Sequence, residues 1–282
     1  MAGFLVTPGT LSVVATPLGH LGDLAPRAAD VLRAADLVAA EDTRRVRKLL
    51  QHVDAHPRVL SFHAHSPPGR LAAILAALDG GAAVALVTDA GTPTVSDPGA
   101  DLVAAARARG HTVVAVPGPS AVAAALSVSG LSADRYTFLG FLPRKGPDRE
   151  ALLAQLAATP RTVVLFEAAP RFARLLADVA RVAGADRQVV VARELTKVHE
   201  EVRIGTAGEL AGYYASHEPR GELTIVIGGA APADAMPVGT DEAAARARVL
   251  LAAGVSRRDA VGRLVAEFGL PRNEAYRLIT EL

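Results

Sequence analysis

The sequence lacks cysteine and tryptophan altogether, and only 4% of its 282 residues are aromatic. The absence of cysteine excludes disulfide bonds and thiolate metal sites, and it is typical of cytoplasmic proteins. No uninterrupted apolar run reaches the roughly 18 residues of a membrane-spanning helix, and the first residues do not have the basic-then-apolar pattern of a secretory signal. We therefore expect a soluble, cytoplasmic protein without a membrane partner.

An excess of charge of either sign is also missing. Lys and Arg together number 30 and Asp and Glu 29, which leaves a net charge of +1. This balance predicts no strong general attraction to nucleic acid, so any contact with RNA must come from local basic patches. Hydrophobic residues make up 50% of the chain, and its length is enough for two modest domains with a sizeable core.

The central stretch of the chain has the clearest pattern. Two apolar, β-branched runs at 84–88 and 112–116 each end in turn-forming residues and lead into an alanine-rich helical run. Asp97 and Gly118, each followed by proline, are expected to start these helices. Such strands are typical of a parallel sheet covered on both faces, which binds ligands beyond the carboxyl ends of its strands. Ordinary tight turns explain the same loops about equally well. The residues predicted to line a crevice here are Gly91, Thr92, Pro93, Ser96, Gly118 and Ser120.

Further strands are predicted on both sides of this stretch, at 10–16, 37–40, 162–166, 188–192 and 223–227. Helical runs separate most of them, which indicates two α/β domains with a ligand cleft between them. The expected division is 1–130 for the N-terminal α/β domain, 131–229 for the second, 230–240 for a small-residue linker and 241–282 for a C-terminal helical segment.

The C-terminal segment is predicted to contain three short helices. They begin near Asp241, Ser256 and Pro271, and Gly254 and Gly269 end the first two. The last two helices have helix-turn-helix spacing. A structural cap and an RNA-binding module both fit this pattern.

One apparent nucleotide-binding pattern is dismissed. Gly19 and Gly22 follow the first predicted strand, and Glu41 lies about twenty residues further on, as in a dinucleotide fingerprint. The first two glycines of that fingerprint are absent, however, and Pro17 stands where the tight turn needs a flexible backbone. A dehydrogenase is therefore not expected.

Several short words of the sequence resemble a known family. DAGTPTVSDPG at 89–99 and PGPSA at 117–121 resemble the signature of the tetrapyrrole methylase superfamily, and EDTR at 41–44 resembles its ribosomal RNA branch in particular. FEAAPR, ARELTKVHEE and RGELTIVI resemble further words of the family, and the resemblance covers most of the chain. It implies a two-domain α/β fold, S-adenosylmethionine as cofactor, 16S rRNA of the small ribosomal subunit as partner, methylation of a cytidine ribose 2′-oxygen, and a homodimer.

The resemblance also implies site residues. Asp42, Lys197 and Glu200 are the catalytic candidates, unranked, because a ribose hydroxyl is a weak acid that benefits from a nearby base. For Glu167 and Arg193, an inter-strand ion pair is as good an interpretation as contact with the cofactor. The residues expected to bind the cofactor are Pro17, Asp89, Gly91, Thr92, Val95, Ser120, Ala121, Glu167, Arg193 and Glu222.

No metal is expected. His63 and His65 lie in a proline-rich loop at 61–70 without a nearby carboxylate, which makes a poor metal site.

Local basic residues are the candidates for RNA contact. Four of the five residues from 44 to 48 are basic, at the start of a helix that Asp42 or Thr43 is predicted to cap. Cations are electrostatically unfavourable at that end of a helix; binding of RNA phosphates would explain them, and a solvated helix start is the alternative. The RNA-binding candidates are Arg44, Arg45, Arg144, Lys145, Arg257 and Arg258.

Two other functions stay open. A methylase of a corrin or porphyrin precursor would share the fold and the donor, and would need basic residues matched to acetate and propionate arms. A non-enzymatic RNA-binding protein would keep the fold without binding the donor. Methyl transfer itself depends mainly on positioning, which is worth about 7 to 11 kcal/mol.

Overall fold

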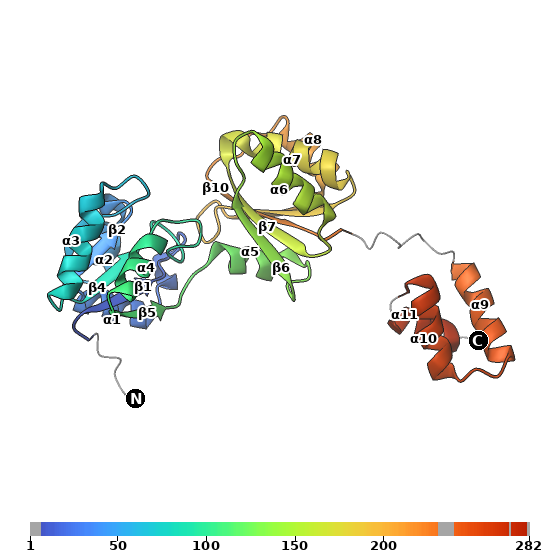
Figure 1. Cartoon of the computed structure of the whole chain (residues 1–282). Coiled ribbons are helices and arrows are strands. Elements are labelled where there is room, and N and C mark those ends of the chain that lie inside the picture. The colour runs from blue at the N-terminus through green and yellow to red at the C-terminus, as the bar shows by residue number, and fades with distance from the viewer. Residues whose placement is uncertain (1–6, 231–239, 271, 281–282) are drawn as a thin grey trace. The chain divides into compact units, whose positions relative to one another are not determined.

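The computed structural model describes residues 7–230, 240–270 and 272–280. The chain divides into two compact units, Met1–Gly228 and Gly229–Leu282. The first unit contains two five-stranded sheets, and the second consists of helices (Figure 1). None of the helices in the described ranges is long and apolar enough to cross a membrane.

The first sheet is entirely parallel, as predicted. Its order is β3-β2-β4-β1-β5. The strands β2 and β5 match the predicted ranges. β3 was not predicted, because this short strand has polar residues at both ends and only its third residue, Leu60, is buried. The strands are β1 Thr10–Val14, β2 Leu37–Ala40, β3 Arg58–Ser61, β4 Val84–Val87 and β5 Thr112–Val116.

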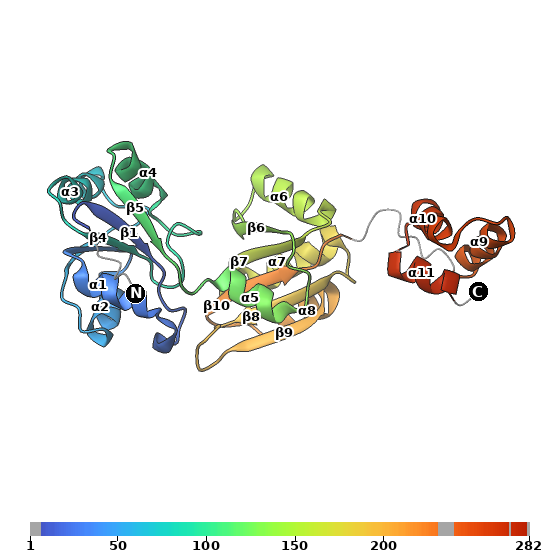
Figure 2. The same ribbon diagram turned by 90° about the horizontal axis from the view of Figure 1, so that it is seen from below.

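Helices cover both faces of this sheet, as Figure 2 shows. Successive residues of a strand point to opposite faces, so Val38 packs with α1 and α2 while Ala39 packs with α3 and α4. Burial of each large aliphatic side chain contributes about 1.5 to 3 kcal/mol. After the short 3₁₀ turn η1 Leu21–Asp23, the helices are α1 Pro26–Ala34, α2 Thr43–His52, α3 Pro68–Asp79 and α4 Ala100–Ala108.

The second sheet is mixed. Its order is β6-β7-β10-β8-β9, and only β6 and β7 are parallel. The sequence pattern predicts three of its strands and misses β6 and β9, which are the two edge strands. The strands are β6 Tyr136–Phe141, β7 Thr162–Ala168, β8 Gln188–Arg193, β9 Glu201–Thr206 and β10 Glu222–Ile227.

One helix crosses from the first sheet to the second. α5 Ala121–Ser129 follows β5 in the chain, yet Val122, Ala125 and Leu126 pack against β7, β8 and β10. The opposite face of the second sheet carries α6 Pro147–Ala158, α7 Ala169–Ala183 and α8 Ala207–Tyr214 (Figure 1). The chain therefore changes sheets at residues 117–120, before α5 rather than after it. Gly118 was expected to start a helix, but α5 has Ser120 as its N-cap.

The starts of α2 and α4 confirm one predicted cap and correct another. Asp42 caps α2, and its carboxylate accepts a hydrogen bond from the Arg44 backbone N–H at 2.8 Å. Asp97 was predicted to cap α4, and this is wrong. The helix begins at Ala100 after Gly99, whose φ of 125° suits glycine, and Asp97 instead lines a cavity.

The second unit contains α9 Thr240–Ala252, α10 Arg257–Phe268 and α11 Arg272–Thr280. The predicted cap Ser256 accepts from the Asp259 N–H at 3.2 Å, and Gly269 ends α10 in the left-handed conformation. The linker predicted at 230–240 lies outside the described residues except at its two ends, and Pro271 lies outside them too. The helices share a core of Ala247, Leu250, Ala260, Val261, Leu264, Ala275 and Ile279.

Candidate functional site

The first unit contains a cavity of about 500 Å³ at the carboxyl ends of the parallel strands. Loops after β1, β2, β4 and β5 form one side, and the ends of β6 and β7 with the start of β10 form the other. A cavity of this volume suits a small organic molecule. Its position is the one at which open parallel sheets bind ligands.

The loop after β4 is held in place by backbone hydrogen bonds. The Thr16 N–H donates to the Gly91 carbonyl at 2.8 Å, and the Gly91 N–H donates back at 3.0 Å. Thr92 donates its hydroxyl to the Pro119 carbonyl at 3.0 Å, which ties this loop to the one after β5. Gly91 has a φ of 85°, and a Cβ here would lie 3.3 Å from Leu18. Glycine therefore keeps the backbone both left-handed and open to the cavity.

The tip of the same loop contacts the second sheet. Thr94 and Ser96 have φ values of 72° and 63°, which residues other than glycine seldom adopt. Gly140 lies at a register shift in β6, and a Cβ there would be 2.8 Å from the Ser96 Oγ. The bare backbone of β6 therefore makes room for a strained loop tip beside the cavity.

The cavity lining is strongly acidic. Among the described residues that line it, Arg45 is the one arginine or lysine. Three of its carboxylates form ion pairs, Asp89 with Arg45 at 3.4 Å, Glu222 with Lys197 at 3.0 Å, and Glu167 with Arg171. The lining carboxylates are Glu41, Asp89, Asp97, Glu167 and Glu222.

Glu41 and Asp97 have no cationic partner among the residues that the structure describes, and they share one hydroxyl. Thr88 donates to Glu41 Oε2 at 3.2 Å and also lies within hydrogen-bonding reach of Asp97. Burial raises the pKa of Asp97 to about 6; the Thr88 hydrogen bond opposes the rise, and the charges of Glu41, Asp89 and Glu222 add to it.

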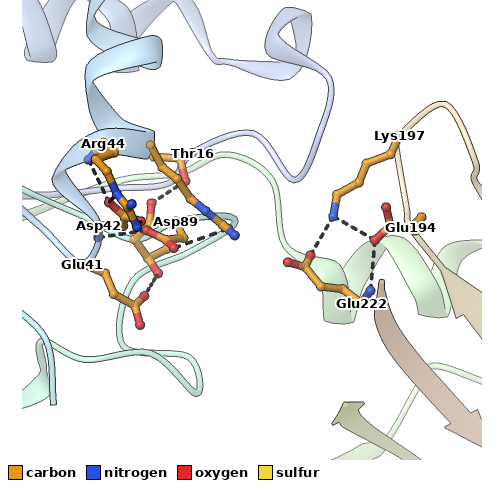
Figure 3. Close-up of polar contacts among 10 residues, drawn as sticks. Thr16, Glu41, Asp42, Arg44, Asp89, Glu194, Lys197 and Glu222 are labelled. Atoms are coloured by element: carbon orange, nitrogen blue, oxygen red, sulfur yellow. Dashed lines mark hydrogen bonds and ion pairs between the residues drawn. The ribbon is translucent and has the colours of Figure 1, made fainter. Parts of the chain in front are cut away.

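Lys197 joins two carboxylates on the second-sheet side, as Figure 3 shows. Its Nζ lies 3.0 Å from both Glu194 Oε1 and Glu222 Oε2. The Glu222 backbone N–H donates to the same Glu194 oxygen at 2.9 Å. A side chain at Gly221 would clash with the Glu194 carboxylate, so this glycine makes room for the group that holds Glu222 at the cavity.

Glu167 is the most enclosed carboxylate of the site. Its side chain is 0% exposed, and Oε1 pairs with Arg171 and accepts from the Ala168 N–H at 2.8 Å. Oε2 has no hydrogen-bond partner among the described residues. A buried acceptor without a donor is costly, so this oxygen suits a ligand that brings an N–H group.

Most of the residues expected to bind a cofactor do line the cavity. Pro17 and Arg193 are the exceptions. Pro17 is buried, and Arg193 forms an ion pair across the strands with Glu201 at 3.0 Å. The residues that line the cavity are Asp89, Gly91, Thr92, Val95, Ser120, Ala121, Glu167 and Glu222.

The three catalytic candidates lie outside the cavity lining. Hydrogen bonds from Arg44 hold the pKa of Asp42 below its usual value. Burial would lower the pKa of Lys197, but its two carboxylate partners raise it, which makes Lys197 a poor proton acceptor. Glu200 accepts a hydrogen bond from the Thr196 backbone N–H. Their catalytic roles stay predictions, and Glu41 and Asp97, which do line the cavity, were not among the candidates.

The RNA candidates divide between the cavity and the surface. Arg45 lines the cavity through its pair with Asp89. Arg44 has 87% of its side chain exposed beside Asp42. The remaining candidates are exposed, in the loop between β6 and α6 or in the first turn of α10, and are Arg144, Lys145, Arg257 and Arg258.

Comparisons with known proteins agree with this architecture. The family model of the Tetrapyrrole (Corrin/Porphyrin) Methylases matches residues 10–211. A Ribosomal RNA small subunit methyltransferase I from Synechocystis is 44% identical over 97% of this chain and 98% of its own length. A protein of that name from Xylella fastidiosa (Temecula1) is 50% identical over 82% of this chain and 86% of its own.

Solved structures show the same fold at low sequence identity. A cobalt precorrin-4 methyltransferase superposes with a TM-score of 0.60 at 22% identity, over 78% of this chain and 95% of that one. A uroporphyrin-III C-methyltransferase from Thermus thermophilus, solved with S-adenosylhomocysteine, has a TM-score of 0.58 at 19% identity, over 78% of this chain and 97% of that one.

Proposed function

This chain belongs to the tetrapyrrole (corrin/porphyrin) methylase family, and we propose that it is an S-adenosylmethionine-dependent methyltransferase of small-subunit ribosomal RNA. The acceptor that we propose is the ribose 2′-oxygen of a cytidine in 16S rRNA. The likeness to the named rRNA methyltransferases extends over nearly the whole chain, and the acid-lined cavity is the observation that supports the choice of donor.

The cavity suits S-adenosylmethionine in volume and charge. Gly91 leaves the backbone open to a ligand. Five carboxylates favour a cation such as a sulfonium, and Glu167 Oε2 lacks a donor that an ammonium or amino group would supply. When bound, this group supplies the methyl. The residues of the cavity bind it, orient it and keep water away.

The same lining argues against a porphyrin or corrin precursor as the acceptor. The acetate and propionate arms of such a substrate call for several cations. Arg45 is the one arginine or lysine among the described lining residues, and it already pairs with Asp89. A ribose hydroxyl is neutral and therefore needs no cations in the cavity.

We propose that the exposed basic residues bind RNA phosphates. For Arg44→Ala we expect weaker RNA binding and a shallower dependence on salt concentration, because one phosphate contact is lost. Arg107→Ala is the matched control, since Arg107 is an exposed arginine on α4 away from the cavity. If Arg44→Ala leaves the salt dependence of RNA binding unchanged, Arg44 is a solvated side chain that does not contact RNA. Arg45 is unsuited to the test because its loss also changes the cavity.

The C-terminal unit is the second proposed RNA contact. It has a core of its own, and Arg257 and Arg258 are exposed at the start of α10. Removal of residues 231–282 should leave donor affinity intact and raise the KM for ribosomal subunits more than it lowers kcat. An unchanged KM together with a lowered melting temperature would make the unit a structural cap.

We also propose that the protein acts in the cytoplasm as a homodimer. The edge strand β9 carries the exposed Ile204, and the exposed Val198 lies just before it. Exposed apolar residues on an edge strand favour association. Sedimentation of Ile204→Asp beside the unchanged protein tests this, and a monomer in both would exclude the dimer.

The central test is transfer of a labelled methyl group from S-adenosylmethionine to purified small subunits that lack the modification. Mass mapping of the RNA should locate a single methylated ribose on a cytidine. Labelling of a base instead, or no transfer to subunits despite donor binding, would overturn the proposal.

A further inference from the structure

Methyl transfer to a hydroxyl releases a proton, and a positioned group that accepts it accelerates the reaction by about 10²- to 10⁴-fold. This inference rests on the function proposed above. The carboxylates that line the cavity are therefore the candidate proton acceptors. Asp42, Lys197 and Glu200 do not line it.

Ion pairing excludes three of the five carboxylates. A carboxylate held by a guanidinium or ammonium is stabilised in its charged form and is therefore a weak base. Asp89, Glu222 and Glu167 each have such a partner. Glu41 and Asp97 do not, among the residues that the structure describes, and they share the hydroxyl of Thr88.

We propose that Asp97 is the catalytic base, which accepts the proton of the acceptor hydroxyl as the methyl group is transferred. The hydroxyl O–H bond breaks and its proton passes to the Asp97 carboxylate. The oxygen forms the new O–CH₃ bond, and the electron pair of the breaking S–CH₃ bond returns to sulfur, which becomes a neutral thioether. The proton then leaves Asp97 for solvent.

The surroundings of Asp97 favour this role over Glu41. The Thr88 hydroxyl donates to Glu41 Oε2 at 3.2 Å, and its interaction with Asp97 offsets only part of the effect of burial. Burial raises the pKa of Asp97 to about 6. At neutral pH the group is therefore ionised, yet more basic than an ordinary carboxylate. The charged groups nearest to it from the surrounding elements are Glu41, Asp89 with its partner Arg45, and Glu222 with its partner Lys197.

Thr88 acts as a positioning residue in this arrangement. Its hydroxyl lies between the two unpaired carboxylates, and its hydrogen bond lowers the pKa of Asp97. Thr88→Val should remove that effect and move the acidic limb of the pH–rate profile to higher pH. A purely structural role would change the rate without moving the limb.

The test compares Asp97→Asn, Asp97→Glu and Glu41→Gln, with Asp101→Asn as control because Asp101 is exposed on α4 outside the cavity. Donor affinity, melting temperature and the pH profile of kcat/KM for methylation of small subunits are measured for each variant. For Asp97→Asn we expect a loss of about 10²- to 10⁴-fold in kcat, donor affinity within a few-fold, and no acidic limb. Asp97→Glu should regain part of the rate.

The unchanged protein should show an acidic limb near pH 6 in kcat/KM, and Asp101→Asn should keep it there. Glu41→Gln should keep a limb but move it to lower pH, because the charge of Glu41 contributes to the raised pKa of Asp97. A folded Asp97→Asn with full activity and the same limb would overturn the inference, as would loss of the limb in Glu41→Gln alone. Failure of the proposed function is distinguishable, since the unchanged protein would then bind the donor but transfer no methyl group to small subunits.

Discussion

The position of Asp97 has a consequence for stability that is independent of catalysis. Its pKa is raised from 3.8 to about 6 by burial and by the neighbouring carboxylates. Converted in full, this difference in pKa corresponds to about 3 kcal/mol of folding free energy. Because the side chain is only half-buried, solvent screens part of this effect, and we expect ~1.5 kcal/mol in the free energy of unfolding. The ionised carboxylate thus destabilises the native state, and Asp97→Asn should stabilise it by about this amount.

The sign of the pH dependence follows from the raised pKa. Above pH 6, Asp97 is ionised in the folded and the unfolded chain, and the native state carries the whole penalty. Below about pH 4 the group is protonated in both states, and the penalty vanishes. The gain in stability from Asp97→Asn should therefore be complete at pH 8 and should disappear as the pH falls from 6 to 4.

Thermal and urea unfolding of the two proteins at pH 8, 6 and 4.5 measure this difference. We expect a melting temperature about 3 to 6 °C higher for Asp97→Asn at pH 8. Asp101→Asn controls for the loss of one charge from the same helix region. A variant that is less stable at pH 8, or whose gain does not depend on pH, would refute the reasoning.

Three further changes test other parts of the structure. Arg149→Met should lower the free energy of unfolding by about 3 kcal/mol, because it removes a buried guanidinium that lies 2.8 Å from Asp178. A melting temperature like that of the unchanged protein would contradict this. Gly140→Ala should lower the free energy of unfolding by about 1 to 2 kcal/mol, because residue 140 has a left-handed backbone. It should also lower donor affinity, because the new Cβ would displace the Ser96 side chain. Adding Ser96→Gly should restore part of that affinity, and unaltered calorimetric binding in the single variant would count against the contact. Addition of EDTA should leave donor affinity unchanged, because the described residues hold no group of three or more possible metal ligands.

Four of the five strands of the parallel sheet were predictable because they are short, mostly apolar runs with turn residues at their ends. β2 and β5 therefore match their predicted ranges. The edge strand β9 was not predictable in the same way. None of its residues is fully buried, and Glu201 and Arg203 stand where a buried strand has aliphatic residues. The packing of α5 on the second sheet depends on contacts far away in the sequence, which periodicity does not report.

The cavity was predictable in outline and not in its chemistry. The glycine and proline turns indicated which loops meet, and Gly91 and Thr92 lie where they were expected. Asp97 was misassigned because Asp before Pro is a common start of a helix. Gly99 extends the loop, so that the carboxylate points to the cavity instead. Which carboxylates remain unpaired depends on tertiary contacts, and the sequence does not contain that information directly.

The crossing at residues 117–120 has a mechanical consequence. β5 belongs to the first sheet and α5 packs on the second, so within residues 7–230 this segment is the only covalent connection between the two sheets. Ser120 in this segment and Ala121, which follows it, also line the cavity. A rotation of one sheet against the other must therefore change the shape of the cavity wall, and a ligand that stiffens this wall must in turn restrict the rotation. In this fold, binding of a ligand in the cavity and the angle between the two sheets therefore influence each other.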